Sequence, residues 1–215
     1  MIAVLASQFD PEARALVAAW SNAGAELLSA EDLCSPGWIF QLNDPSEGIA
    51  VVGGKRVKVS ELRAVLTRRP AVVAEELGRI NSADRAYVAA ETNAFLVAWL
   101  SALPCRVVNR PRPSSLCGPA WDALHWHAAA AKAGLAWDYL ANKEKAHTVV
   151  VCGPRALFAR NQREQTSALT LARAANVELL AVRMRRGKIC SASVAPDLSN
   201  EELRGCLLDH LLEVE

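Results

Sequence analysis

Residues 90–111, AETNAFLVAWLSALPCRVVNRP, change their hydrophobic pattern from that of a helix to that of a strand. The alanine- and leucine-rich part belongs to a predicted helix from about Ser82 to Leu103. The run from Cys105 to Asn109 is short and apolar, which predicts a strand, and Asn-Arg-Pro then turns the chain. A helix that leads directly into a buried strand indicates an α/β fold.

The segments before this stretch follow the same alternation of strand and helix. Residues 2–6 and 64–67 are apolar runs of strand length. Residues 11–24 carry a helical apolar stripe behind an Asp-Pro start signal, and a glycine ends the predicted helix. Residues 49–59 form two β-rich runs around a Gly-Gly pair, which predicts a hairpin.

The segments after residue 111 repeat the alternation. We expect helices at residues 119–134 and 156–175 and a strand at 147–152. We also expect a hairpin at 178–194, in which Leu180, Val182 and Met184 face one way and the residues between them face the other. Ser199 and Glu202 have the spacing of a capping box, which predicts a last helix. The most polar break, residues 138–147, is the best boundary by composition.

The composition is that of an ordinary soluble globular protein, with 215 residues, 52% hydrophobic and 22% charged. The formal net charge of +1 gives no overall field that would attract nucleic acid or an anionic membrane. The strongest apolar run, residues 94–100, is far shorter than a membrane span, so we expect no membrane contact and a cytoplasmic location. The six cysteines form no close pair, which favours free thiols over disulfides or a zinc site.

Two histidines lie close together at His125 and His127, but their spacing does not suit a metal. Trp121, Leu124 and Ala128 follow a helical pattern, and residues two apart on a helix point about 200° apart. We therefore predict no metal site here.

The residues around His125 also allow a different hypothesis, a catalytic site built on a cysteine thiol. Cys117 precedes the predicted helix, where a thiol pKa can fall, and Asp122 is three residues before His125. Cys117 as nucleophile with His125 and Asp122 is therefore one candidate catalytic group, although capping and packing explain the same residues.

The order of three motifs resembles that of the ATP-grasp ligases, especially those that modify ribosomal peptides. These are LTRRP at residues 66–70, the passage 90–111, and AAAAKAGL at residues 128–135. The passage 168–199 is similar to the end of the family's catalytic lobe. The resemblance implies an α/β fold with an open pre-ATP-grasp sheet and flanking helices in residues 1–118, and a helix plus a small remnant of the C-terminal lobe in residues 119–215, packed as one compact unit.

The sequence departs from the family at the groups that hold the nucleotide. The family has a lysine at the start of the helix that ends at a glycine. In this sequence that glycine is Gly134, and Ala123 stands at the position of the lysine. The hairpin that should supply a metal-binding carboxylate and an asparagine, AVRMRRGKICSASVAP, has no acidic residue. The segment between Leu135 and Val149 is too short for the family's lid domain. We therefore expect a degenerate relative without a lid that needs no cofactor or metal.

The leading functional hypothesis is a non-catalytic accessory or binding protein for a peptide, an anionic ligand or a partner enzyme in a peptide- or small-molecule-modifying pathway. Strand ends are the usual ligand edge of an open α/β sheet. The candidate binding residues are Arg68, Arg69, Asn109, Arg110, Arg183 and Arg185, although arginines of this kind can also pair with nearby glutamates.

Two alternatives stay open. The chain could be an enzyme, either a minimal ATP-dependent carboxylate-amine ligase using Mg and ATP or the thiol enzyme described above. It could also form a homodimer through exposed aromatic residues such as Trp38, Phe40 and Trp137.

Overall fold

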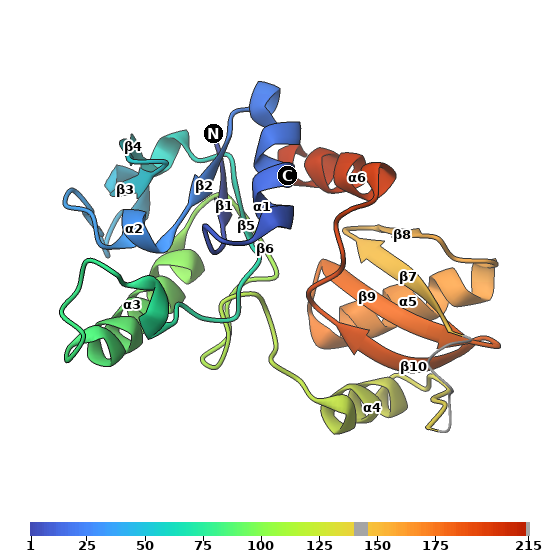
Figure 1. The fold of residues 1–215 in the computed structure, drawn as a ribbon. Helices are drawn as coiled ribbons and strands as arrows, with labels where there is room; N and C mark the ends of the chain where they lie inside the picture. Colours follow the sequence, from blue (N-terminus) through green and yellow to red (C-terminus); the bar gives the residue numbers. More distant parts are fainter. Residues whose placement is uncertain (140–145, 214–215) are drawn as a thin grey trace. The chain divides into compact units, whose positions relative to one another are not determined.

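A computed structural model describes residues 1–139 and 146–213 (Figure 1). The chain separates into two compact units. The N-terminal unit comprises residues 1–118 and 211–215, and the C-terminal unit comprises residues 119–210. The predicted division into residues 1–118 and residues 119–215, packed as one compact unit, stays a prediction.

The N-terminal unit is built on a parallel sheet of four strands in the order β2-β1-β5-β6. The strands are β1 (Ile2–Leu5), β2 (Ala25–Leu28), β5 (Ala64–Thr67) and β6 (Arg106–Val108). Leu5 of the central strand β1 is in register with Leu28 on one side and Thr67 on the other. The carboxyl ends of these strands therefore meet at one edge of the sheet.

Helices and a hairpin surround this sheet. The helices are α1 (Pro11–Ala19), α2 (Ala30–Leu33) and α3 (Arg85–Ala102), with short 3₁₀ turns at Ser21–Ala23, Pro45–Glu47, Val59–Glu61 and Ala74–Glu76. The hairpin strands are β3 (Ile49–Val52) and β4 (Lys55–Lys58). Leu96 and Trp99 of α3 share one buried cluster with Ala3 and Leu5 of β1, while Ile2 and Val4 are buried on the opposite face.

The C-terminal unit is built on an antiparallel sheet in the order β10-β9-β7-β8. The strands are β7 (His147–Cys152), β8 (Arg155–Leu157), β9 (Leu179–Arg185) and β10 (Lys188–Ser193). Residues of β7 and β9 that alternate along the strands, including Val149, Leu180 and Val182, form one core with α5. This alternation matches the prediction for the hairpin and leaves the other face of the sheet outside that core.

Three helices belong wholly or largely to this unit: α4 (Ala123–Lys132), α5 (Gln162–Ala175) and α6 (Glu201–Leu212). Trp126 and Ala130 of α4, together with Leu171 of α5, join the core cluster. The helical pattern of Trp121, Leu124 and Ala128 does not mark the buried face of α4, because Leu124 is 72% exposed.

The structure corrects several predicted elements. Residues 155–157 form strand β8, whereas the sequence predicted a helix from residue 156, and α5 begins only at Gln162. Strand β2 was not predicted at all, although it completes the parallel sheet. Helix α4 begins at Ala123 because Asp122 caps it, and the predicted helical residues 119–122 lie outside it. The last helix is capped by the Asn200 side chain, which accepts a hydrogen bond from Leu203 N–H, and not by Ser199.

The three aromatic residues predicted to be exposed are only partly accessible. Trp38 packs edge-to-face against Phe95 and Trp99, and Phe40 also contacts Phe95. Trp137 packs beside the core of the C-terminal unit. These rings contribute to the two cores while staying partly accessible, so a dimer formed through them stays a prediction.

None of the helices within residues 1–139 and 146–213 is long and apolar enough to cross a membrane. The six cysteines are free thiols. The predicted cytoplasmic location stays a prediction.

Candidate functional site

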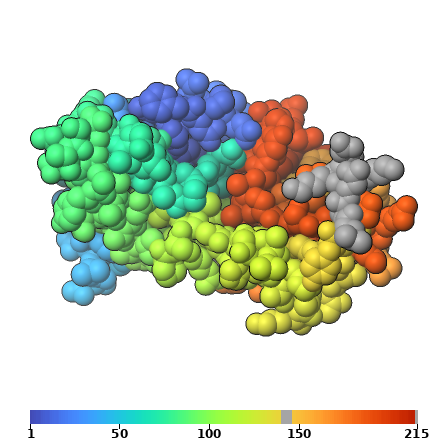
Figure 2. Space-filling view, turned by 60° about the horizontal axis from the view of Figure 1, so that its bottom comes forward, coloured from blue at the N-terminus to red at the C-terminus, as the bar shows by residue number. Residues whose placement is uncertain are grey.

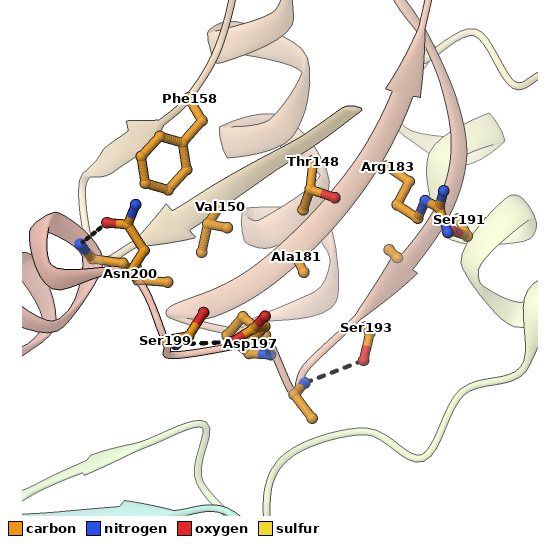
Figure 3. Close-up of a pocket in the computed structure, with 14 residues that line it drawn as sticks. Thr148, Val150, Phe158, Ala181, Arg183, Ser191, Ser193, Asp197, Ser199 and Asn200 are labelled. Atoms are coloured by element: carbon orange, nitrogen blue, oxygen red, sulfur yellow. Dashed lines mark hydrogen bonds between the residues drawn. The ribbon is translucent and has the colours of Figure 1, made fainter. Parts of the chain in front are cut away.

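A pocket of about 340 Å³ opens on the face of the C-terminal sheet that points away from its core (Figure 3). We call it the sheet-face pocket. Its lining comes from β7, β9 and β10, from the residue after β8, and from residues 195–203 at the start of α6. All of these residues belong to the C-terminal unit. Its volume lies at the lower end of small-molecule sites in proteins.

Two rows of side chains across three strands form the floor of the pocket. Strand register places Thr148, Arg183 and Ser191 in one row. The next row consists of Val150, Ala181 and Ser193. The floor therefore has a polar row with one guanidinium group beside a mainly apolar row, as Figure 3 shows.

A β-bulge in β10 is needed for this arrangement. Met184 pairs with Ile189, whereas the neighbouring Arg183 pairs with Ser191, so Cys190 is the extra residue. Paired residues of antiparallel strands point to the same face of a sheet. The bulge thus places the serine side chains on the pocket face, where strict alternation from Ile189 would place Cys190.

Phe158 and Asn200 lie at the end of the pocket opposite Arg183 (Figure 3). Phe158 follows β8 and has a φ of 63°, a left-handed conformation that costs a bulky residue about 1–3 kcal/mol. Its side chain is nevertheless 40% exposed. Strain that presents an accessible aromatic ring to a pocket is typical of a functional position.

Residues 193–200 form the remaining wall through short local hydrogen bonds. Ser193 Oγ accepts from Ala195 N–H at 3.2 Å, and Asp197 Oδ1 accepts from Ser199 N–H at 2.8 Å. Asn200 Oδ1 accepts from Leu203 N–H at 3.1 Å, and this bond leaves the amide NH₂ of Asn200 as a donor. These bonds fix the wall and the start of α6.

Metal ligands are scarce in this site. Asp197 is the one carboxylate among the residues that line the pocket. Across residues 1–139 and 146–213, no group of three histidine, cysteine, aspartate or glutamate side chains could hold a metal ion. Magnesium in proteins is typically held by one or two carboxylates together with waters and substrate phosphates, and this lining offers one carboxylate.

The predicted arginines of the N-terminal unit contact acidic groups of their own chain. Arg68 Nη2 lies 2.7 Å from Glu12 Oε2, and its Nε lies 3.4 Å from Asp10 Oδ2. Arg69 pairs with Glu76, and both side chains are less than a tenth exposed. Burial acts to raise the pKa of Glu76, but hydrogen bonds from Ser7 and Arg69 outweigh it and hold that pKa below its ordinary value.

Asn109 and Arg110 turn the chain after β6. Asn109 is buried and has a φ of 53°, a conformation that asparagine tolerates better than most residues. The Arg110 guanidinium donates hydrogen bonds to four backbone carbonyl oxygens around the end of α3, those of Leu100, Ser101, Leu103 and Cys105. Arg110 thus caps α3.

In the hairpin, the two predicted arginines differ in their surroundings. Arg185 binds Asp138 with Nη2 2.8 Å and Nε 3.2 Å from the same carboxylate oxygen. Arg183 lines the sheet-face pocket. The structure brings none of the other predicted binding residues to this pocket, and a ligand role for Arg68, Arg69, Asn109, Arg110 and Arg185 stays a prediction.

Of the predicted thiol site, Cys117 belongs to the N-terminal unit and Asp122 and His125 to the C-terminal unit, and their joint catalytic role stays a prediction. Cys117 is 6% exposed, and its Sγ lies 3.5 Å from Ser115 Oγ. It precedes α4 by several residues, so the expected position at a helix start was wrong. Asp122 Oδ1 accepts from His125 N–H, and His125 Nδ1 lies 2.7 Å from the same oxygen.

These hydrogen bonds, first the one from the His125 backbone and then that from its ring, hold the pKa of Asp122 below its ordinary value. His127 instead contacts Tyr139 and Trp137. The two histidines therefore diverge, as their spacing predicts.

The N-terminal unit has a hollow of about 440 Å³ lined by polar loops. Asp32 there accepts hydrogen bonds from Gly54 N–H and from Ser29, and Glu31 lies 3.7 Å from Arg79. Figure 2 shows the segment around Arg79, in green, at the surface. We prefer the sheet-face pocket because it combines an apolar floor with a few polar groups.

Sequence reasoning missed Phe158, Asp197 and Asn200. Asn200 had a readable signal, because it precedes two glutamates at a helix start. Thr148 could have been found from its alternation with buried valines in β7. Phe158 had no such signal, because no sequence pattern indicates a phenylalanine with a left-handed backbone conformation.

Several solved structures have the same fold as this chain. The ATP-grasp ligase PsnB, complexed with minimal precursor, Mg and ADP, has a TM-score of 0.68 and 12% identity, covering 99% of this chain and 98% of that chain. The macrocyclase MdnC from Microcystis aeruginosa, bound with precursor peptide MdnA, has a TM-score of 0.70 and 10% identity, covering 99% of both chains. This chain has an ATP-grasp-like fold.

An ATP-grasp protein with a RimK domain from Sphaerobacter thermophilus is also similar, with a TM-score of 0.57 and 14% identity over 99% of both chains. The resemblance predicted from sequence is therefore confirmed for the ATP-grasp-like α/β fold. No model of a protein family matches the sequence, and no curated protein matches it. Identities of 10–14% establish a shared fold and do not establish a shared activity.

Proposed function

We propose that this chain is a non-catalytic binding protein with an ATP-grasp-like fold, which recognises a peptide or another anionic ligand as an accessory in a peptide-modifying pathway. The observation that carries the proposal is the sheet-face pocket, which has Arg183 in its floor and Asp197 as its one carboxylate. A pocket with this lining suits the binding of an anion better than the binding of a magnesium–nucleotide complex.

The absence of catalysis is proposed from what phosphoryl transfer requires. Such reactions depend on positioned cations and metal ions around the phosphates. The hairpin 179–193 offers basic and hydroxyl side chains and no carboxylate. Lining of this kind supports a binding role.

A peptide as the ligand is supported by the structural neighbours. PsnB and MdnC are each solved with a precursor peptide, and both have the fold of this chain. We propose that a peptide or protein partner binds here as well. A homodimer is a further proposal, and size-exclusion chromatography with light scattering tests it by the molar mass in solution.

A minimal ATP-dependent ligase is the second candidate. It is favoured by the fact that PsnB is complexed with Mg and ADP in a structure of the same fold. In that case Mg and ATP would be cofactors of this chain.

Calorimetry with Mg·ATP and an assay of ADP release separate the two candidates. We expect no binding of Mg·ATP at micromolar concentrations and no ADP release, with or without an added acidic peptide. An active ATP-hydrolysing enzyme serves as the positive control of the assay. Tight binding of Mg·ATP together with ADP release would overturn the proposal in favour of the ligase.

A further inference from the structure

We propose that the N-terminal unit has a second binding site, which takes an aliphatic diamine as a doubly charged cation. The site consists of two hollows of about 440 Å³ and about 170 Å³, whose linings share Gln8, Glu31 and Arg79. We call the two together the double hollow. None of its lining residues belongs to the sheet-face pocket, so this inference is independent of the proposed function.

The double hollow lies where the carboxyl ends of two parallel strands meet. Gln8 comes three residues after the end of β1, and Ser29 comes directly after β2. The rest of the lining comes from α2, from the turn between β3 and β4, and from residues 75–79 after β5. A crevice at this edge of an open α/β sheet is the usual place for a small ligand.

The larger hollow contains a buried carboxylate with an unused acceptor position. Asp32 is 6% exposed. It accepts hydrogen bonds from Ser29 N–H at 2.8 Å, from Ser29 O–H at 2.9 Å and from Gly54 N–H at 2.7 Å. These bonds occupy three of the roughly four lone-pair positions of a carboxylate. Within residues 1–139 and 146–213, Asp32 forms no ion pair, so a cationic ligand would supply the counter-charge that a buried carboxylate favours.

Most hydrogen-bond donors of the larger hollow are already in use. Ser35 O–H donates to the Glu31 carbonyl oxygen at 2.8 Å, and Gly53 N–H donates to the Leu27 carbonyl oxygen at 3.0 Å. Three further donors bind the buried carboxylate. The larger hollow therefore offers mainly acceptors, which suits a ligand whose own groups donate, such as an ammonium group.

The charges of the double hollow point to a ligand with two positive charges. The lining contains four carboxylates, those of Glu31, Asp32, Glu75 and Glu76. Two of them face a guanidinium group, because Glu31 lies 3.7 Å from Arg79 and Glu76 pairs with Arg69. Among the residues that the structure describes, Asp32 and Glu75 form no ion pair. One of these two carboxylates lines each hollow, so two ammonium groups joined by a chain can reach both.

The smaller hollow can accommodate the carbon chain between the two charges. Ala30, Leu77 and the ring of Phe9, which is 70% exposed, supply apolar surface there. An aromatic ring also attracts a nearby ammonium group through its face. Burial raises the pKa of the Cys34 thiol in this lining, so the thiol stays neutral and adds no charge.

A metal ion is a poorer match for the same charges. In the part of the chain that the structure describes, no three histidine, cysteine, aspartate or glutamate side chains are placed to hold one metal ion. A metal ion would concentrate both positive charges at one point, whereas a diamine spreads them over both hollows and brings its own hydrogen-bond donors.

The test is an NMR chemical-shift titration of the full-length protein with 1,4-diaminobutane in metal-free buffer. Butylamine has one ammonium group, 1,4-butanediol has none, and norvaline carries one ammonium group and one carboxylate. We expect the diamine to bind about tenfold or more tightly than butylamine, because butylamine lacks the second charge-assisted contact. The diol should bind more weakly than butylamine. The shifts should centre on the backbone amides of Gln8, Gly54 and Arg79.

Variants connect binding to the two unpaired carboxylates. Asp32→Asn should weaken the diamine about tenfold or more. Because Asp32 also fixes the start of α2, the exposed Glu75 provides a second test. Glu75→Gln should lower the affinity for the diamine toward that of butylamine and leave the affinity for butylamine unchanged. Glu47→Gln, an exposed acidic position outside both hollows, is the matched control and should change neither affinity. Thermal unfolding checks that each variant is folded.

Four results would overturn the inference. These are equal affinity for the diamine and butylamine, tighter binding of norvaline than of the diamine, full affinity of folded Glu75→Gln for the diamine, and shifts that centre outside the double hollow. The release of ADP tests only the proposed function. A protein that releases ADP can still bind the diamine here, and one that ignores the diamine can still be a non-catalytic binding protein.

Discussion

Arg69 and Arg183 are both arginines close to a sheet, but their surroundings differ. Arg69 follows β5 in the N-terminal unit, is buried, and pairs with Glu76, whose side chain is 9% exposed. Arg183 lies within β9 in the C-terminal unit and lines an open pocket. The same residue type therefore maintains the fold in one region and lines a candidate ligand pocket in the other. For Arg69, burial beside an acidic partner gives it the structural role.

The largest effect we predict is the loss of the Arg69–Glu76 pair. Glu76→Gln leaves the Arg69 charge buried without a counter-charge, so the free energy of unfolding should fall by about 3–5 kcal/mol. Urea unfolding followed by circular dichroism measures this change. Glu75→Gln, at an exposed neighbouring position, is the matched control and should change stability by no more than about 0.5 kcal/mol.

The double variant Arg69→Met, Glu76→Leu sharpens the same comparison. It removes both charges, so it should be more stable than Glu76→Gln alone. If Glu76→Gln unfolds as the unchanged protein does, Arg69 has no structural role, and the contrast with Arg183 is lost.

A smaller effect is expected from pH. Because the folded pKa of Glu76 lies below its ordinary value of 4.5, its stabilising contribution is complete above that pH and is lost as the pH falls through the lower folded pKa. Urea unfolding between about pH 6 and pH 3 should show the advantage of the unchanged protein over Glu76→Gln shrinking toward acid. An advantage that grows toward acid would contradict the direction of this pKa shift.

The smallest effect concerns the strained residue of the pocket. Phe158→Gly should be more stable than Phe158→Ala by about 1–2 kcal/mol, because only glycine adopts a positive φ without a steric cost. Denaturant unfolding of the two variants gives the difference. The same pair of substitutions at Phe9, which is exposed and not at a positive φ, should show no advantage for glycine. Equal stability of the two Phe158 variants would mean that the ring is not held under strain.

The sequence was a good guide wherever regular patterns decide the structure. The strand at 147–152, the hairpin around Gly53-Gly54 and the alternation of β9 are found where they were predicted. The missed strand β2 is short, and its sequence AELL contains no β-branched residue, so local preference did not identify it. Its place in the sheet is fixed by pairing with β1, which is a contact between distant segments.

The candidate site was predictable only in part. Arg183 was among the predicted binding residues, and the alternation of β9 indicates that it points away from the core. Its neighbours come from β8 and the start of α6, and no local pattern indicates that these segments meet. The other predicted arginines looked equally basic in sequence, but their partners, such as Glu12 and Glu76, come from other segments or turns of the chain.

The bulge at Cys190 also determines which changes of chain length the pocket can tolerate. Deletion of Cys190 would remove the extra residue and keep Ser191 opposite Arg183 and Ser193 opposite Ala181. Deletion of Ala192 would bring the next residue into its place and turn Ser193 toward the core. Position 190 is therefore where the chain can lose a residue and keep the hydroxyl lining, whereas a loss one or two positions later would turn Ser193 away from the pocket.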